Sequence, residues 1–366
     1  MIIDTHVHLI RPFDSRGKPH IYSAGNPVSA EDYVALMDAS GIDRAFFISW
    51  SPEDLPAELD HEGIDQWNAH ETMSREYALE AMRRFPERFY WFPCHMGPTL
   101  SRFLDYGSTP DRSIRIERTL RRAGVSPESR RARQTSGRVL WHQRPSADAK
   151  HSLGDAAAMA RENLELGAAG LKLVCSFWGE LPDDERLLPL YQLADDYHAQ
   201  IIIDTSYWYL GKDDPADPDA LGKGHRDVAR RVTDFQDYLT HLAPIVSAYP
   251  HVNFQLAHAG ARSFTPDHAA EAGRFIRSYP NVFADLGALP TDSLALERLV
   301  ESAGADRVMF GTDWPHFAQG AAMREAVDQV RRPGRFTKAE AAMILGENAL
   351  RFVGGRAPGL RPARTA

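Results

Sequence analysis

The sequence predicts a single-domain α/β protein, a (β/α)₈ TIM barrel. Eight short apolar runs recur along the 366 residues, and stretches with helical spacing of apolar residues separate many of them. Nearly continuous apolar strands that alternate with amphipathic helices are typical of a parallel sheet covered by helices. Eight such units indicate a closed barrel. No Gly-x-Gly-x-x-Gly follows a strand, which disfavours an open dinucleotide-binding sheet.

The predicted strands are short and rich in β-branched or aromatic residues. They span residues 1–9, 44–50, 88–96, 169–175, 200–208, 253–260, 281–289 and 307–315. Between them, apolar residues recur at helical spacing. The helices predicted from this spacing are 29–41, 183–199, 234–249, 268–279 and 293–304. Ser29 is placed to cap the first of them.

Two connections are longer than a barrel needs. Residues 51–68 follow the second strand and residues 97–154 follow the third. Loops after barrel strands lie at the C-terminal face, where active sites of this fold are built, so we expect both insertions to crowd the mouth. The barrel domain is predicted to span 1–353, with 97–154 as an arginine-rich insertion or cap, followed by a C-terminal tail, 354–366.

Composition excludes several classes of function. Hydrophobic residues make up 43% and charged residues 25%, as in ordinary globular proteins, and the net charge of -8 argues against nucleic-acid binding. No stretch approaches the ~20 apolar residues that span a bilayer. The first residues lack the basic region of a signal peptide and there are only two cysteines, so we expect a cytoplasmic protein without membrane contact.

One segment has an unusual charge. Residues 111–144 contain ten arginines and three acidic residues, a local balance of +7. A solvated surface insertion explains this composition, and a subunit contact or a lid over an anionic ligand are the alternatives.

The motif DTHVHL in the first strand carries two histidines. His6 and His8 are two residues apart, so on a strand their side chains share one face, about 7 Å apart along the chain. A metal ion fits between two imidazoles so placed, although satisfied or exposed histidines also produce this pattern.

Other strand ends bring further polar residues to the same end of the barrel. They are Lys172, Asp204, His258 and Asp313. A charged residue in a buried strand is costly unless it is paired or binds a metal. Together, His6, His8 and Asp313 therefore predict a metal site at the mouth of the barrel.

The ordered set of strand-end motifs resembles the amidohydrolase superfamily, in the amidohydrolase-related branch of hydrolases and non-oxidative decarboxylases. The set comprises DTHVHL, QLAHAGA, VFADLGAL, RVMFGTDWP and ILGENALRFV. The resemblance implies that His6 and His8 bind one divalent metal ion, usually zinc or manganese. It also implies that Asp313 is a ligand and proton carrier, and that His258 polarises the substrate carbonyl or passes a proton.

The fifth strand departs from the family pattern. A histidine ligand usually ends it, whereas this sequence reads IIIDTSYW, with Asp204 in that place. As a ligand, Asp204 would favour manganese, iron or magnesium over zinc; the alternatives are a structural aspartate and a substrate contact. In dinuclear relatives a fourth-strand lysine is carbamylated. Here we expect Lys172 to pair with Asp204 or to hold a substrate carboxylate.

Four tryptophans lie at or just beyond strand ends. They are Trp50, Trp178, Trp208 and Trp314. Because a barrel interior favours aliphatic residues, these side chains are expected to line a pocket for a flat, aromatic or otherwise unsaturated substrate. Packing beneath the long loops is the alternative.

These residues support three functions. The first is a metal-dependent hydrolase, in which activated water attacks an amide, lactone or related carbonyl of a small molecule. The second is a non-oxidative decarboxylase of an aromatic or enoic acid, and the third is a catalytically silent ligand-binding barrel, which the departure at Asp204 keeps open. A homodimer is expected from the frequency of dimers among soluble proteins.

Overall fold

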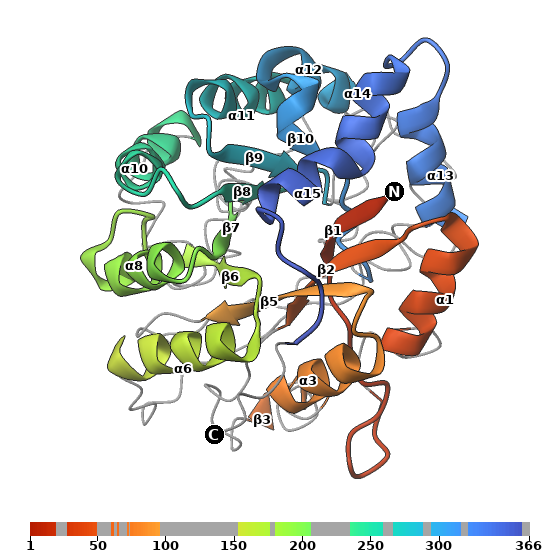
Figure 1. The fold of residues 1–366 in the computed structure, drawn as a ribbon, viewed down its shortest axis with the longest axis vertical. Helices are drawn as coiled ribbons and strands as arrows, with labels where there is room; N and C mark the ends of the chain where they lie inside the picture. Colours follow the sequence, from red (N-terminus) through yellow and green to blue (C-terminus); the bar gives the residue numbers. More distant parts are fainter. Residues whose placement is uncertain are drawn as a thin grey trace.

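Eight parallel strands form one sheet in the computed structural model, and helices surround them (Figure 1). The structure describes residues 1–19, 28–49, 60–61, 64–65, 72, 74–95, 153–175, 180–205, 235–258, 266–287, 294–315 and 321–360. The strand order is β1-β2-β5-β6-β7-β8-β9-β10, as expected when each strand pairs with the next one along the chain. The predicted TIM barrel is confirmed.

Each strand of the barrel lies within a predicted range. They are β1 (Ile3–Val7), β2 (Arg44–Ser49), β5 (Phe89–His95), β6 (Gly170–Leu173), β7 (Gln200–Asp204), β8 (Phe254–Ala257), β9 (Val282–Asp285) and β10 (Val308–Met309). A small antiparallel pair that the sequence did not predict, β3 (Asp60–His61) and β4 (Ile64–Asp65), belongs to the first insertion. Otherwise this insertion, and the second up to residue 152, lie outside the described residues.

The five predicted helices are confirmed, and others complete the outer layer. The predicted helices are α1 (Ala30–Ser40), α8 (Leu188–Asp196), α10 (Phe235–Ala248), α11 (Pro266–Ser278) and α12 (Leu294–Ala303). The additional helices are α3 (Arg75–Arg84), α6 (Leu153–Leu166), α13 (Ala321–Arg331), α14 (Lys338–Ala342) and α15 (Asn348–Phe352). Ser29 caps α1 as predicted, because its hydroxyl accepts a hydrogen bond from the backbone of Asp32 at 3.1 Å. The Asp32 carboxylate accepts from the Ser29 backbone in return, which completes a capping box.

The barrel closes where its last strand meets its first. The backbone N–H of Thr5 donates to Phe310 at 2.8 Å, that of His8 donates to Trp314 at 2.7 Å, and that of Asp313 donates to His6 at 2.8 Å. Closure therefore places the motifs DTHVHL and GTDWP side by side, although about 300 residues separate them in the sequence.

Aromatic side chains fill much of the barrel interior. Alternate strand residues form an inner buried cluster that includes Phe46, Tyr90, Phe92 and Phe283, and Phe352 of α15 joins it. Phe352 lies 5.6 Å from Phe283 between ring centroids. Aliphatic residues such as Ile3, Ile48 and Ile202 share this cluster, so the interior combines aliphatic and aromatic side chains.

The described part of the C-terminal tail is held against the barrel. The guanidinium of Arg356 donates to the carbonyl of Ala168 at 3.0 Å, and the backbone N–H of Gly359 donates to Phe89 at 2.9 Å. Both contacts lie before or at the start of strands β5 and β6, away from the strand ends that carry polar residues. Among the described residues, no helix is long and apolar enough to cross a membrane.

Candidate metal centre

Three buried side chains meet at the end of β1 and beyond β10. Each of His6, His8 and Asp313 offers one ligand atom, and these atoms all lie within 4.8 Å of one another. The Nε2 atoms of His6 and His8 lie 3.5 and 3.4 Å from the same carboxylate oxygen, Oδ1 of Asp313. The three residues predicted together from the sequence are thus brought together by the fold.

Hydrogen bonds on the far side of each ring decide which nitrogen faces the cluster. Nδ1 of His6 lies 2.9 Å from the Asp285 carboxylate, and Nδ1 of His8 lies 3.0 Å from the carbonyl of Ile48. Both partners accept, so Nδ1 is the donor of each neutral ring and Nε2 presents a lone pair. Burial lowers the pKa of His8, although Asp313 opposes this effect, so that ring favours the neutral form.

Lone pairs of two imidazoles and a carboxylate therefore point at one region from which water is largely excluded. Neutral imidazoles and carboxylates are ligands of divalent transition metals, and three such acceptors without a cation would repel one another. The donor set of His6, His8 and Asp313 fits a divalent metal ion.

The acid of DTHVHL has a structural role. Asp4 accepts hydrogen bonds from the Thr312 hydroxyl at 2.6 Å, the Thr312 backbone at 2.9 Å and the Tyr33 hydroxyl at 2.7 Å. Burial raises the pKa of Asp4 to about 6, against the effect of these donors. Asp4 thus joins the first strand to the segment that carries Asp313.

The backbone at the strand ends is unusual. The pairing of β1 with β2 shifts in register between Asp4 and Val7, and such irregularities re-aim side chains. His258 and Asp313 have φ values of 64° and 54°, in the left-handed region that residues other than glycine rarely adopt. Conformations of this kind persist where surrounding contacts hold them, and they cluster at functional sites.

The remaining predicted polar residues form a chain beside the cluster. Nε2 of His258 lies 3.4 Å from Oδ2 of Asp313, and its Nδ1 lies 3.8 Å from Oδ2 of Asp204. The same Asp204 oxygen lies 3.7 Å from Nζ of Lys172. Asp204 is buried beside Lys172 and His258, outside the group of three converging ligands, and its role as a ligand stays a prediction.

Lys172 is a buried cation near the candidate metal site. Its side chain is 3% exposed, and within the described part of the chain Nζ has no hydrogen-bond partner. Its charge contributes to lowering the pKa of both His8 and Asp285, as expected for an ammonium group close to them. The neighbours of Lys172 on β6, Leu171 and Leu173, belong to a larger buried cluster that includes residues of the surrounding helices. Because side chains alternate along a strand, Lys172 faces the barrel interior.

The predicted tryptophan wall is only partly described. Trp50, Trp178 and Trp208 lie outside the described residues. Trp314 is fully buried, and its ring centroid lies 4.8 Å from that of Tyr33 on α1. Trp314 therefore packs in the core, and its predicted substrate contact stays a prediction.

Sequence reasoning missed the role of Asp285 at the end of β9. This carboxylate contacts the ring of His6 and is completely buried. Burial raises its pKa, but the charge and hydrogen bond of His6, followed by the charges of His258 and Lys172, outweigh burial and lower the pKa to about 2. The signal was present in VFADLGAL, since Asp285 ends a buried strand just as Asp204 does.

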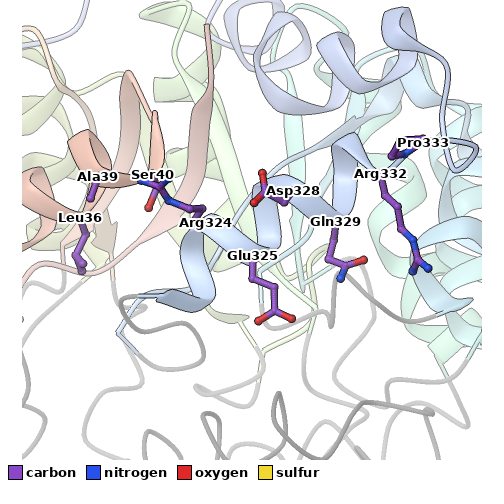
Figure 2. A pocket seen from close by; sticks show the side chains of 9 residues that line it. All are labelled: Leu36, Ala39, Ser40, Arg324, Glu325, Asp328, Gln329, Arg332 and Pro333. Carbon is purple, nitrogen blue, oxygen red and sulfur yellow. The ribbon is translucent and has the colours of Figure 1, made fainter.

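A separate groove of about 780 Å³ lies on the outer layer of the barrel, between α1 and the end of α13 (Figure 2). Its lining residues are Leu36, Ala39, Ser40, Arg324, Glu325, Asp328, Gln329, Arg332 and Pro333. None of them comes from a strand end, so this groove is distinct from the candidate metal centre.

The fold and the cluster of His6, His8 and Asp313 define the class of this protein as a TIM barrel with a candidate metal site at its strand ends. The chain belongs to the amidohydrolase family, whose model matches residues 143–355, more than half of the 366 residues. This confirms the resemblance seen in the sequence. The match includes Lys172, His258 and Asp313, whereas His6 and His8 precede it. No curated protein matches this chain.

Solved structures share the barrel at low sequence identity. An uncharacterized TIM-barrel protein from Bordetella bronchiseptica is 16% identical, with 97% of this chain and 99% of that chain covered and a TM-score of 0.56. The 5-carboxyvanillate decarboxylase of Sphingomonas paucimobilis is 13% identical, with 96% and 98% covered and a TM-score of 0.51. A 5-carboxyvanillate decarboxylase from Novosphingobium aromaticivorans, complexed with manganese and 4-hydroxy-3-methoxy-5-nitrobenzoic acid, is 16% identical, with 96% of each chain covered and a TM-score of 0.51. These similarities concern the fold.

Proposed function

We propose that this protein is a metal-dependent hydrolase of a small, unsaturated carbonyl compound such as an amide or lactone. The observation that carries the proposal is the convergence of three buried lone-pair donors, with Nε2 of His258 3.4 Å from Asp313. His6, His8 and Asp313 hold the ion. A bound divalent metal, zinc or manganese, supplies Lewis acidity that polarises a carbonyl oxygen and lowers the pKa of water.

Asp313 and His258 are the proposed proton carriers. Oδ1 of Asp313 faces the two histidines and Oδ2 faces His258, so one carboxylate serves both groups. Asp313 takes the proton of the attacking water, and His258 carries a proton to the leaving group. Asp204, 3.8 Å from Nδ1 of His258, stabilises the protonated ring.

Lys172 is the proposed anchor for a negatively charged group of the substrate. Its ammonium is buried next to the catalytic groups and stands 3.7 Å from Asp204, beyond hydrogen-bond distance. A carboxylate that enters this region gains a charge-assisted hydrogen bond from Lys172. The predicted aromatic walls, Trp50, Trp178 and Trp208, would then hold a flat ring.

Non-oxidative decarboxylation of an aromatic or enoic acid is the second candidate. The two decarboxylases of similar fold support it, since one of them was solved with manganese and a nitrobenzoic acid. In this reaction Lys172 would hold the substrate carboxylate beside a metal bound by His6, His8 and Asp313. His258 or Asp313 would deliver a proton to the ring carbon before carbon dioxide leaves. The same residues thus serve either reaction.

Metal content and product analysis test these proposals. Protein purified without chelator is expected to contain about one equivalent of divalent metal, lost when His6→Ala and His8→Ala are combined. Incubation with aromatic acids and lactones then separates the reactions, because decarboxylation releases carbon dioxide and hydrolysis does not. A protein that contains no metal, and whose properties the histidine changes leave unaltered, would contradict both metal-dependent reactions. A cytoplasmic location and a homodimer stay predictions.

A further inference from the structure

Among the described residues, the carboxylate of Asp285 makes four hydrogen-bond contacts. Its Oδ2 atom lies 2.9 Å from Nδ1 of His6 and accepts from the Gln255 amide at 2.5 Å. Its Oδ1 atom accepts from the backbone N–H groups of His258 and Gly287, both at 2.8 Å. The side chain is completely buried behind the metal-ligand cluster. One carboxylate thus serves a proposed metal ligand through one oxygen and the backbone of a proposed proton carrier through the other.

The Oδ2 side sets the tautomer of His6. An ionised carboxylate only accepts hydrogen bonds, so Nδ1 of His6 must carry the proton. The opposite nitrogen, Nε2, is then left with its lone pair on the side of Asp313, 3.5 Å away. Partners of this kind orient a metal-bound histidine and raise its basicity.

The Oδ1 side holds the turn that presents His258. This residue adopts a φ of 64°, which is unfavourable unless other contacts stabilise it. The hydrogen bond from its backbone N–H to Asp285 is such a contact. With the turn so held, the His258 ring stacks on that of His6 at a centroid distance of 4.7 Å and its Nε2 faces Asp313.

Gly287 leaves room for this arrangement. A Cβ atom at position 287 would lie 2.9 Å from Oδ1 of Asp285 and 3.0 Å from Nδ1 of His6. Any larger residue there would push on the hydrogen-bonded pair. The close approach of the Gly287 backbone is therefore part of how the fold seats Asp285.

We propose that Asp285 is a positioning residue, which fixes the metal-facing nitrogen of His6 and the orientation of His258 together. This inference rests on the proposed metal-dependent function. Asp285 acts through these two histidines, because it contacts the Nδ1 side of the His6 ring and the backbone N–H of His258. It predicts that metal affinity and proton transfer both depend on one carboxylate that contacts neither metal nor substrate.

The isosteric change Asp285→Asn tests the proposal. If the amide NH₂ faces His6, Nδ1 must accept and the proton moves to Nε2, where it opposes metal binding. If the amide is turned over, its NH₂ faces the backbone N–H groups of His258 and Gly287. We expect Mn²⁺ affinity, measured on the full chain by titration after metal removal, to fall by about 10- to 100-fold. Asp43→Asn is the control, since Oδ2 of Asp43 accepts a hydrogen bond at 2.7 Å from the backbone N–H of Ile2, just before β1.

A spectroscopic measurement on the unchanged protein keeps the test decisive if Asp285→Asn does not fold. Nitrogen-15 NMR of metal-free protein is expected to show His6 as the Nδ1–H tautomer. A neutral His6 ring protonated on Nε2 instead of Nδ1, or Mn²⁺ binding by Asp285→Asn as tight as that of Asp43→Asn, would overturn the role of Asp285. A failure of the proposed metal-dependent function would look different from a failure of the role of Asp285. In that case wild-type protein would not bind Mn²⁺, or His6→Ala would leave its Mn²⁺ binding unchanged.

Discussion

The two sides of the barrel mouth hold their polar groups differently. On the closure side, formed by β1, β9 and the end of β10, His6 lies 2.9 Å from Asp285, and Asp4 accepts from Thr312 at 2.6 Å. On the lysine side, formed by β6 and β7, Lys172 and Asp204 stand 3.7 Å apart. On the closure side, hydrogen bonds hold His6 and Asp4 to their carboxylate and hydroxyl partners, whereas on the lysine side Lys172 and Asp204 approach without reaching hydrogen-bond distance.

This difference corresponds to two tasks. A metal ion requires ligands already held in one geometry, and the hydrogen bonds of the closure side supply that rigidity. A substrate anion requires a cation whose hydrogen bonds are still available. Lys172 meets this requirement, because its Nζ has no hydrogen-bond partner among the described residues. If the two sides have these separate tasks, substitutions on the closure side should change metal binding and substitutions on the lysine side should change substrate binding.

The largest effect is expected for Asp313→Asn on the closure side. The substitution replaces the carboxylate that faces His6, His8 and His258 with a neutral amide, which cannot accept a proton. Turnover is expected to fall by about 10²- to 10⁴-fold, the range for loss of a general acid–base group. Steady-state kinetics and metal content should be measured together. Unchanged turnover would remove Asp313 from the mechanism.

On the lysine side, Lys172→Met should affect substrate and leave the metal in place. Loss of a hydrogen bond to a charged group costs about 1.5–3 kcal/mol, so kcat/KM for a carboxylate substrate should fall by about 10- to 100-fold. Metal content is the internal control. If the metal is lost instead, Lys172 belongs with the metal ligands and the division between the two sides fails.

Asp285 on the closure side should make the stability of metal-free protein depend on acid. Its folded pKa of about 2 lies below the ordinary value of 3.8, so ionisation stabilises the folded chain. This contribution, about 2 kcal/mol, is present above about pH 4 and is lost as the pH falls toward 2. Denaturant unfolding of wild type and Asp285→Asn should therefore differ more at pH 7 than at pH 2. A difference independent of pH would contradict the ionised state of Asp285.

The smallest effect is expected in the outer groove, which lies on neither side of the mouth. Arg324→Ala and Arg332→Ala change exposed side chains on α13 and just after it. Stability should change by less than about 0.5 kcal/mol, as for surface substitutions, and turnover should be unchanged. Reduced turnover in these variants would indicate that the groove communicates with the strand ends.

Most of the fold could be predicted from the sequence. The short apolar runs are rich in β-branched and aromatic residues, which favour buried strands, so the composition of each run predicts its own strand. Ser29 marks the start of a helix because its hydroxyl caps the first backbone N–H groups. The candidate site was predictable in part for a similar reason. Parallel strands bring their C-terminal ends to one rim, so His6, His8, His258 and Asp313 had to lie near one another.

Side-chain partners were less predictable. Asp285 and Asp204 both end buried strands, yet one contacts His6 and the other lies between Lys172 and His258. Trp314 follows a strand end as a pocket residue would, but it is buried against Tyr33. Local sequence does not distinguish these outcomes, because the neighbours of each residue come from distant parts of the chain.

The sequence by itself determined the eight strands, the rim at which they end and the residue types that reach it, since these follow from local periodicity and composition. Only the tertiary structure decided which groups meet. Closure of β10 onto β1 joins Asp313 to His6, and the left-handed backbone at His258 and Asp313 turns their side chains toward the cluster. The pair of His6 and Asp285 spans 279 residues of sequence. Such contacts depend on barrel closure and on backbone conformations that no local pattern specifies.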